Sequence, residues 1–176
     1  VDNGAIRAMR VDSYRFLPRS FRPFYENAVP IEGEVDPVWA PFETRLAEAR
    51  IALLSSAGLY VEGSQQPFDL DRERREPSWG DPSWRRIPAA AGSGQLGASH
   101  LHVNTVDILA DTNIALSSQR LDELVVDGTV GASTDSHLSV MGFQQSDLNV
   151  WRTETAPQIV ELLRDERADG VVLAPV

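Results

Sequence analysis

The chain has 176 residues, of which 42% are hydrophobic, and it carries a formal net charge of −10 at pH 7 with a pI near 4.7. This length and apolar content suffice for one domain with a full core. The acidic balance disfavours nucleic acid and anionic membrane surfaces as partners, because both bind through clustered positive charge. No apolar run approaches the roughly 18 residues of a membrane span, and Val1–Asp12 lacks the apolar core of a signal peptide, so we expect a soluble cytoplasmic protein.

Two residue types are missing from the sequence. There is no cysteine, which excludes a disulfide, a thiolate metal site and a thiol nucleophile within these residues. There is also no lysine, so Schiff-base chemistry and a phosphate-loop lysine are excluded, and arginine is the only permanent cation available for a substrate carboxylate. The base composition of the genome is the simpler explanation of this preference for arginine over lysine.

The first part of the chain predicts an irregular segment followed by a helix. Residues 1–35 are rich in arginine and aromatics without a sustained period, so we expect an irregular segment that packs on its own domain or on a partner. From Asp36, a suitable N-cap, to about Arg50 the spacing predicts an amphipathic helix with these positions on one face: Val38, Trp39, Phe42, Leu46 and Ala49. Residues 36–176 are expected to form a single domain.

A short buried strand is predicted at Ile51–Leu54, followed by the small residues Ser55–Gly58. A loop of this kind after a first strand suits ligand binding, because the backbone can approach an anion closely. The sequence has neither G-x-G-x-x-G nor Gly-Lys-Ser/Thr, so no nucleotide and no other cofactor is predicted.

Residues 63–97 form a long polar stretch, which predicts a loop with a function or an ordinary surface loop. In the functional interpretation Trp79 and Trp84 wall a pocket, and Arg85 or Arg86 holds a substrate carboxylate. In the structural interpretation the tryptophans pack inward and the charges, including those of the cluster Asp71–Glu76, are solvated.

His100 and His102 are two of only three histidines, and an extended backbone would point both imidazoles to the same face. Such a pair can transfer protons, bind a polar substrate or be purely structural. It can also bind a metal, with a third ligand from Asp107, Asp111 or the segment 135–137. No metal site is predicted from so weak a motif. Asp135-Ser136-His137 predicts no hydrolytic triad, because neighbours in sequence rarely form one.

Two helices and a strand are predicted in the last third of the chain. One helix covers 119–127, with Ser117 or Ser118 as the cap; the other begins near Thr153. The final apolar run 170–176 predicts a buried strand of a parallel sheet. Because a last strand would leave an unprotected sheet edge, we expect a dimer or a partner chain to cover it. The alternation predicts an α/β fold with an open, mostly parallel sheet and flanking helices, Rossmann- or flavodoxin-like and possibly incomplete.

The sequence contains seven motifs whose order and spacing resemble those of the selenoprotein B family. Members of that family are the substrate-binding components of the glycine, sarcosine, betaine and D-proline reductases. The resemblance covers roughly Arg50 to Val176. The motifs are Ile51–Gly58, Gln66–Asp69, Gly80–Pro88, Ser99–His100, Asp111–Asn113, Arg120–Leu124 and Asp169–Leu173.

The resemblance implies a dithiol-dependent reductive cleavage of a C–N bond in an amino acid or related amine. In that family a selenocysteine or cysteine directly follows the strand that matches Val171–Val176, and this sequence lacks it. Two explanations are open. Either the product continues through a UGA codon read as selenocysteine, or the chain ends here as a binding or interaction subunit.

The candidate site follows from these patterns and from the resemblance. His100 and His102 are the candidate catalytic residues, with His100 as a proton donor and Arg85 as the carboxylate anchor. The other candidate substrate-binding residues are Ser55, Ser56, Gly58, Ser83, Asp111, Asn113 and His137. The alternatives are a non-catalytic partner subunit, in a homo-oligomer or a hetero-complex, and a metal-dependent hydrolase that uses the two histidines.

Overall fold

The computed structural model describes residues 40–76, 78–142, 144 and 148–176, within which Pro41–Val176 form one compact unit. A mixed, mostly parallel sheet lies at its centre. β1 (Arg50–Ser55) pairs in parallel with β5 (Ala132–Ser133), β6 (Ser136–Val140) and β7 (Gly170–Ala174), and β3 (Trp84–Pro88) is antiparallel to β6. The α/β fold class is therefore confirmed; the expected irregular segment 1–35 lies outside the described residues.

β1 is the strand that the others surround. Since β7 pairs with β1 from Ile51 to Ser55, β5 and β6 share the opposite edge of β1. A separate two-stranded antiparallel sheet joins β2 (Leu59–Val61) and β4 (Leu96–Ala98). The carboxyl ends of β1, β6 and β7 consequently meet at one edge of the main sheet.

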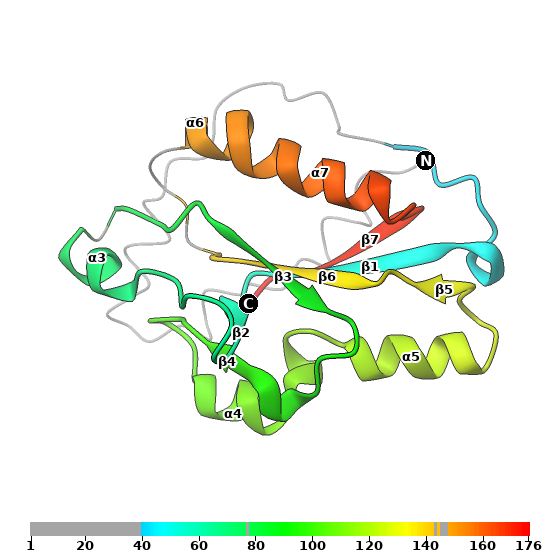
Figure 1. Cartoon of the computed structure of the whole chain (residues 1–176), viewed down its shortest axis with the longest axis horizontal. Coiled ribbons are helices and arrows are strands. Elements are labelled where there is room, and N and C mark those ends of the chain that lie inside the picture. The colour runs from blue at the N-terminus through cyan, green and yellow to red at the C-terminus, as the bar shows by residue number, and fades with distance from the viewer. Residues whose placement is uncertain (1–39, 77, 143, 145–147) are drawn as a thin grey trace, which may run out of the picture. The chain divides into compact units, whose positions relative to one another are not determined.

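Helices cover both faces of this sheet (Figure 1). α7 (Ala156–Asp165) lies on one face; α4 (Thr105–Ala110) and α5 (Ser118–Val126) lie on the other. Side chains alternate along β1, so Ile51 and Leu53 join the core beneath α4 and α5, while Leu54 packs against the core beneath α7. Among the described helices, none is both long and apolar enough to cross a membrane.

The connections leave adjacent strands toward opposite faces. The chain after β1 runs through α3 (Leu70–Arg75), α4 and α5 before it returns to β6. After β6 it passes through α6 (Leu148–Val150), a π-helix (Trp151–Thr155) and α7 on the other face, and then enters β7 on the far edge of β1. In open α/β sheets a crevice forms where neighbouring strands send their connections to opposite faces. That place is the carboxyl edge between β1 and β6.

The predicted helix over 36–50 is wrong for its described part, because only Leu46–Glu48 form a short 3₁₀ turn before β1. The backbone there pairs elsewhere: the carbonyls of Leu46 and Ala49 accept hydrogen bonds from the amides of Gly131 and Ala132. Of the described positions on the predicted apolar face, Phe42 and Leu46 are half exposed and only Ala49 is buried. Residues 36–39 lie outside the described part of the chain.

The long polar stretch 63–97 is more ordered than predicted. It contains α3, whose N-cap Asp69 accepts a hydrogen bond from the amide of Arg72, and β3, a 3₁₀ turn (Ser93–Gln95) and β4. The sequence pattern did not predict β3, because Trp-Arg-Arg-Ile-Pro contains two arginines and only one buried apolar residue, Ile87. The strand is formed by its pairing with β6, which local sequence does not indicate.

The final helix and strand also differ in detail from the prediction. Helical structure begins at Leu148 and not near Thr153, because the π-helix precedes α7. β7 forms as predicted but is not buried: Val171 and Val172 are exposed and Leu173 is 66% exposed. The reason is its place at the edge, with β1 as its one strand neighbour among the described residues. β1 and α5 are confirmed, and Ser117 stands at the N-cap of α5.

Gly58 is required by the backbone at the end of β1. Its φ is +63°, and a Cβ there would lie 2.1 Å from the carbonyl oxygen of Ser99 and 2.7 Å from the sulfur of Met141. We expect Gly58→Ala to lower the free energy of unfolding by more than about 2 kcal/mol, because a positive φ is strained and the clash involves backbone.

Gly63→Ala is the matched control for that prediction. Its φ is +73°, yet nothing lies within 4 Å of the added carbon, so a loss of only about 1 kcal/mol is expected. Urea unfolding of both variants measures the difference, and equal losses would show that the contact with Ser99 is unimportant.

Candidate functional site

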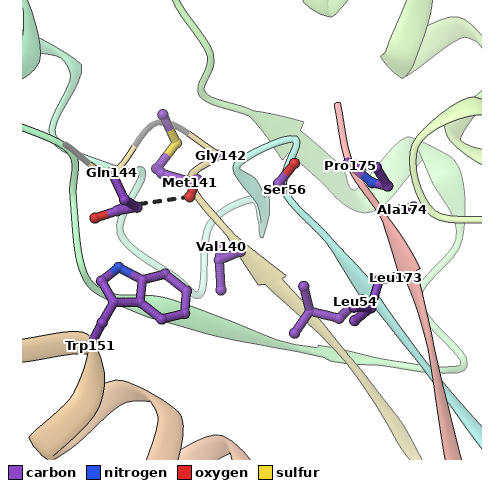
Figure 2. A pocket seen from close by; sticks show the side chains of 10 residues that line it. All are labelled: Leu54, Ser56, Val140, Met141, Gly142, Gln144, Trp151, Leu173, Ala174 and Pro175. Atoms are coloured by element: carbon purple, nitrogen blue, oxygen red, sulfur yellow. Dashed lines mark hydrogen bonds between the residues drawn. The ribbon is translucent and has the colours of Figure 1, made fainter. Parts of the chain in front are cut away.

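A cavity of about 400 Å³ lies at the carboxyl ends of β1, β6 and β7 (Figure 2). This is the edge at which the sheet topology predicts a binding crevice. Ten residues line it: Leu54, Ser56, Val140, Met141, Gly142, Gln144, Trp151, Leu173, Ala174 and Pro175.

Four segments build these walls: the ends of β1, β6 and β7 and the start of the π-helix. Leu54 and Val140 point to the α7 face of the sheet by strand alternation, and the end of β7 adds the wall beside Ser56. Trp151 faces these strand ends from the start of the π-helix. Single π-helical turns are frequent at functional sites, because the extra residue re-aims a side chain.

The cavity is apolar with few polar groups, the usual chemistry of a small-molecule site. The amide of Val176 donates a hydrogen bond of 2.8 Å to the Ser56 hydroxyl. The Gln144 side-chain amide donates to the carbonyls of Asp81 at 2.8 Å and Met141 at 3.4 Å. Gln144 Oε1 and Trp151 Nε1 are buried, and neither has a hydrogen-bond partner among the described residues. None of the ten described lining residues is charged.

Of the predicted loop Ser55–Gly58, only Ser56 lines this cavity. Ser55 is fully buried, and its hydroxyl accepts a hydrogen bond of 3.2 Å from the amide of Ala57. The amide of Gly58 donates to the carbonyl of Val140 at 3.0 Å, and its carbonyl accepts from the amide of Ser99. Ser55 and Gly58 therefore shape the turn behind the cavity.

Ser83 lies in a different hollow, a cavity of about 360 Å³ between the start of β3 and the helices that follow β6. The Trp84 indole lines the same hollow and donates a hydrogen bond of 2.9 Å to Gln158. Trp79 is buried, with the guanidinium of Arg72 4.2 Å from its ring centre. Trp79 lines neither of the two described cavities, and the prediction that it walls a pocket with Trp84 stays a prediction.

Arg85 is held by structural contacts. Its guanidinium donates to the carbonyls of Gln66, Pro67 and Trp84 and to the Ser83 hydroxyl, and it stacks 4.1 Å from the centre of the Phe68 ring. It lines neither described cavity, and its role as a carboxylate anchor stays a prediction.

Arg86 has a different structural task. It donates to the Ser136 hydroxyl at 2.6 Å and to Glu166 at 2.8 Å. Glu166 also accepts from the amide of Ser136, so this network joins β3 and β6 to the end of α7.

His100 and His102 lie on a bend after β4 and not on a strand. The amide of His102 donates to Nδ1 of His100 at 3.1 Å, and the rings stand edge to face with centroids 6.0 Å apart. Burial, and then the neighbouring imidazole, lowers the pKa of His100. Their catalytic roles stay predictions.

Glu73 is a neighbour of His102 that the sequence did not reveal. Its Oε1 lies 3.8 Å from Nε2 of His102, and the Glu73 side chain is buried. The sequence places Glu73 in the charge cluster Asp71–Glu76, which we expected to be solvated; the signal that identifies it is burial. In the part of the chain that the structure describes, no group of three or more acidic or histidine side chains could hold a metal ion.

The remaining candidates lie away from the first cavity. Asp111 caps a 3₁₀ turn (Thr112–Ile114): it accepts hydrogen bonds from Asn113, and these lower its pKa. His137 on β6 is 1% exposed, and its Nδ1 accepts a hydrogen bond of 3.3 Å from the amide of Leu53. Their substrate-binding roles stay predictions.

Comparison with curated proteins finds one similar chain, the D-proline reductase subunit gamma of Acetoanaerobium sticklandii. It is 28% identical over 137 residues, which is 78% of this chain and 52% of the relative. The chain thus spans about half the length of the curated relative that it matches. No protein-family model matches the chain, and no solved structure matches it. The similarity supports a reductase-related role, in agreement with that part of the resemblance.

His137 makes the stability of the fold depend on pH. Burial lowers its pKa below the ordinary value of 6.5, so its stabilising contribution is present above 6.5 and is lost as the pH falls toward the folded pKa. We expect the wild-type chain to lose up to about 1.4 kcal/mol per pH unit in this range relative to His137→Gln, whose amide oxygen can still accept from Leu53. Urea unfolding from about pH 7.5 to 5.5 measures this, and parallel pH profiles would contradict it.

Proposed function

We propose that this chain is the substrate-binding part of a dithiol-dependent reductase that cleaves a C–N bond of an amino acid or related amine in the cytoplasm. The similarity to a protein named D-proline reductase subunit gamma supports the reaction class. The apolar cavity at the carboxyl edge of the sheet supports a small-molecule substrate.

The observation that carries the proposal is the contact between the end of β7 and the cavity. The Val176 amide donates to the hydroxyl of Ser56, which lines the cavity beside Ala174 and Pro175. A group attached next to Val176 would therefore stand at the cavity rim. In the proposed reaction a thiolate or selenolate at this point attacks the carbon, and the C–N electron pair leaves with the nitrogen, which takes up a proton.

The 176 residues contain no cysteine, so the nucleophile of the proposed reaction lies outside them. Inside the cavity, Leu54, Val140 and Trp151 would hold the carbon skeleton and Ser56 would offer a hydroxyl. Arg85 remains the proposed carboxylate anchor and His100 the proposed proton donor. The selenocysteine or cysteine is supplied by a continuation of the chain in this proposal.

A second candidate function is a non-catalytic binding subunit of a larger complex. The specific observation in its favour is the exposed apolar edge strand: Val171, Val172 and Leu173 are all exposed on β7. Such an edge can pair with another chain. The matched relative is itself named a subunit.

The cysteine-free sequence allows a direct test of ligand binding at the cavity. In Val176→Cys the single thiol stands beside Ser56, so a bound molecule should shield it from an alkylating reagent. With D-proline, glycine, sarcosine or betaine at about ten times its Kd, we expect alkylation to slow about tenfold, since only the free fraction reacts.

Val126→Cys is the matched control, because Val126 is 89% exposed at the end of α5 and lies outside the cavity. Its alkylation rate should not change with any of the four probes. If none of them slows Val176→Cys relative to this control, the cavity does not bind these substrates and the proposed function is wrong.

The exposed edge generates a separate prediction about association. We expect the chain to self-associate at micromolar concentration and Leu173→Arg to shift it to monomer, because a charge on an edge strand opposes pairing. Sedimentation velocity measures the shift, with Val126→Arg as the control. A wild-type chain that is already monomeric at this concentration would contradict the prediction.

A further inference from the structure

Ser56 binds the chain on both sides of Pro175, just beyond β7. Its amide donates a hydrogen bond of 3.1 Å to the carbonyl of Ala174. Its hydroxyl accepts a hydrogen bond of 2.8 Å from the amide of Val176, and it donates one of 3.4 Å to the main-chain oxygen of the same residue. One residue at the end of β1 thus holds both polar main-chain groups of Val176.

Sheet pairing gives this segment little other support. Pro175 has no amide hydrogen, so it can donate nothing to a ladder. β7 has β1 as its one strand neighbour among the described residues, and Leu173 is 66% exposed. The half-buried Val176 side chain packs against the core, which retains the residue without fixing the direction of its backbone. A chain segment of this kind is well ordered only where specific bonds restrain it, and here Ser56 provides them.

Gly142 leaves room for the main-chain oxygen of Val176 at the cavity wall. A Cβ on Gly142 would lie 3.2 Å from that oxygen and 3.1 Å from the hydroxyl oxygen of Ser56, which is closer than ordinary van der Waals contact. The backbone can approach this closely because residue 142 has no side chain. Ser56 and Gly142 both line the cavity (Figure 2). The point at which a residue would be joined to Val176 therefore lies at this wall.

The contacts of Ser56 differ from those of the neighbouring buried hydroxyls. The hydroxyls of Ser55 and Ser139 accept hydrogen bonds from backbone amides in and after the turn that follows β1, so they stabilise the fold itself. Among the described residues, the Ser56 hydroxyl bonds only to Val176. Removing it would consequently release the chain end and leave the bonds of the turn intact.

We propose that Ser56 is a positioning residue for the nucleophile of the reaction, with Gly142 leaving the space that this position requires; this rests on the proposed function. With both main-chain groups of Val176 held, the next residue of a longer chain starts beside Gly142 and keeps one place at the cavity rim. Ser56 performs this task through the backbone of Val176. A displacement of about 1 Å in a reacting group can cost about a hundredfold in rate, so a fixed backbone here contributes to turnover.

The first test measures position and needs no activity. In the cysteine-free chain, one cysteine is added after Val176 and a second replaces Leu54, which lines the cavity from β1. We expect a short dimaleimide to join these two thiols efficiently, and Ser56→Ala to slow the joining about tenfold, because a released chain end lowers the effective concentration of its thiol. Ser56→Thr keeps the hydroxyl and should keep the rate. Val126→Cys in place of the cysteine at 54 gives the background rate, since Val126 is exposed outside the cavity.

Gly142→Ala should also slow the joining, because its Cβ displaces the Val176 oxygen. Gly94→Ala is the matched control: nothing lies within 4 Å of its added carbon, so the rate should not change. Equal rates with Ser56 and with Ser56→Ala would overturn the inference. A urea midpoint of Ser56→Ala lowered as far as that of Gly58→Ala would also overturn it, since the hydroxyl would then stabilise the whole domain.

The second test separates positioning from substrate binding. In the complete reductase, supplied with dithiol and D-proline, Ser56→Ala should lower kcat about tenfold to a hundredfold with KM unchanged, and Ser56→Thr should restore kcat. A raised KM with unchanged kcat would refute positioning, because Ser56 would then bind the substrate. If the wild-type complex does not cleave D-proline, the proposed function fails on that result, while the crosslinking rates still decide whether Ser56 holds the chain end.

Discussion

Parallel pairing along both edges of β1 is the constraint on which the rest of the structure depends. β7 covers one edge from Ile51 to Ser55, and β5 and β6 cover the other. The side chain of Asp169 accepts a hydrogen bond from the Arg50 amide, which fixes the start of this pairing. Since the strands run in the same direction, their carboxyl ends meet, and the cavity exists because three ends stop at one edge.

Local patterns predicted those parts of the fold that are stabilised locally. β1 is a short apolar run and α5 is followed by Gly128, and both elements were found, although Ser117 at the N-cap of α5 makes no capping hydrogen bond. The helix over 36–50 failed because its backbone groups pair with Gly131 and Ala132, 80 or more residues away. β3 was missed for the same reason, since its partner β6 and the anchor of Arg86 on Glu166 are distant in sequence.

The site was predictable only where it follows a strand directly. Ser56 was identified from its place after β1, whereas Trp151, Gln144 and Leu173 line the cavity through the tertiary arrangement of three separate segments. Glu73 was hidden for another reason: in a run of six charges, sequence does not indicate which one the fold encloses. Burial of a charge is a property of packing and has no local signature.

The π-helix at Trp151–Thr155 couples the cavity to the core beneath α7, because Trp151 lines the cavity and also packs against that core. A π turn holds one residue more than an α turn, and each residue of an α-helix turns the chain by about 100° and advances it about 1.5 Å. Loss of one residue there would rotate Trp151 away from the strand ends, while Ile159 on α7 kept its contacts with the sheet. A change in this turn would therefore alter the wall of the cavity and the packing beneath α7 together.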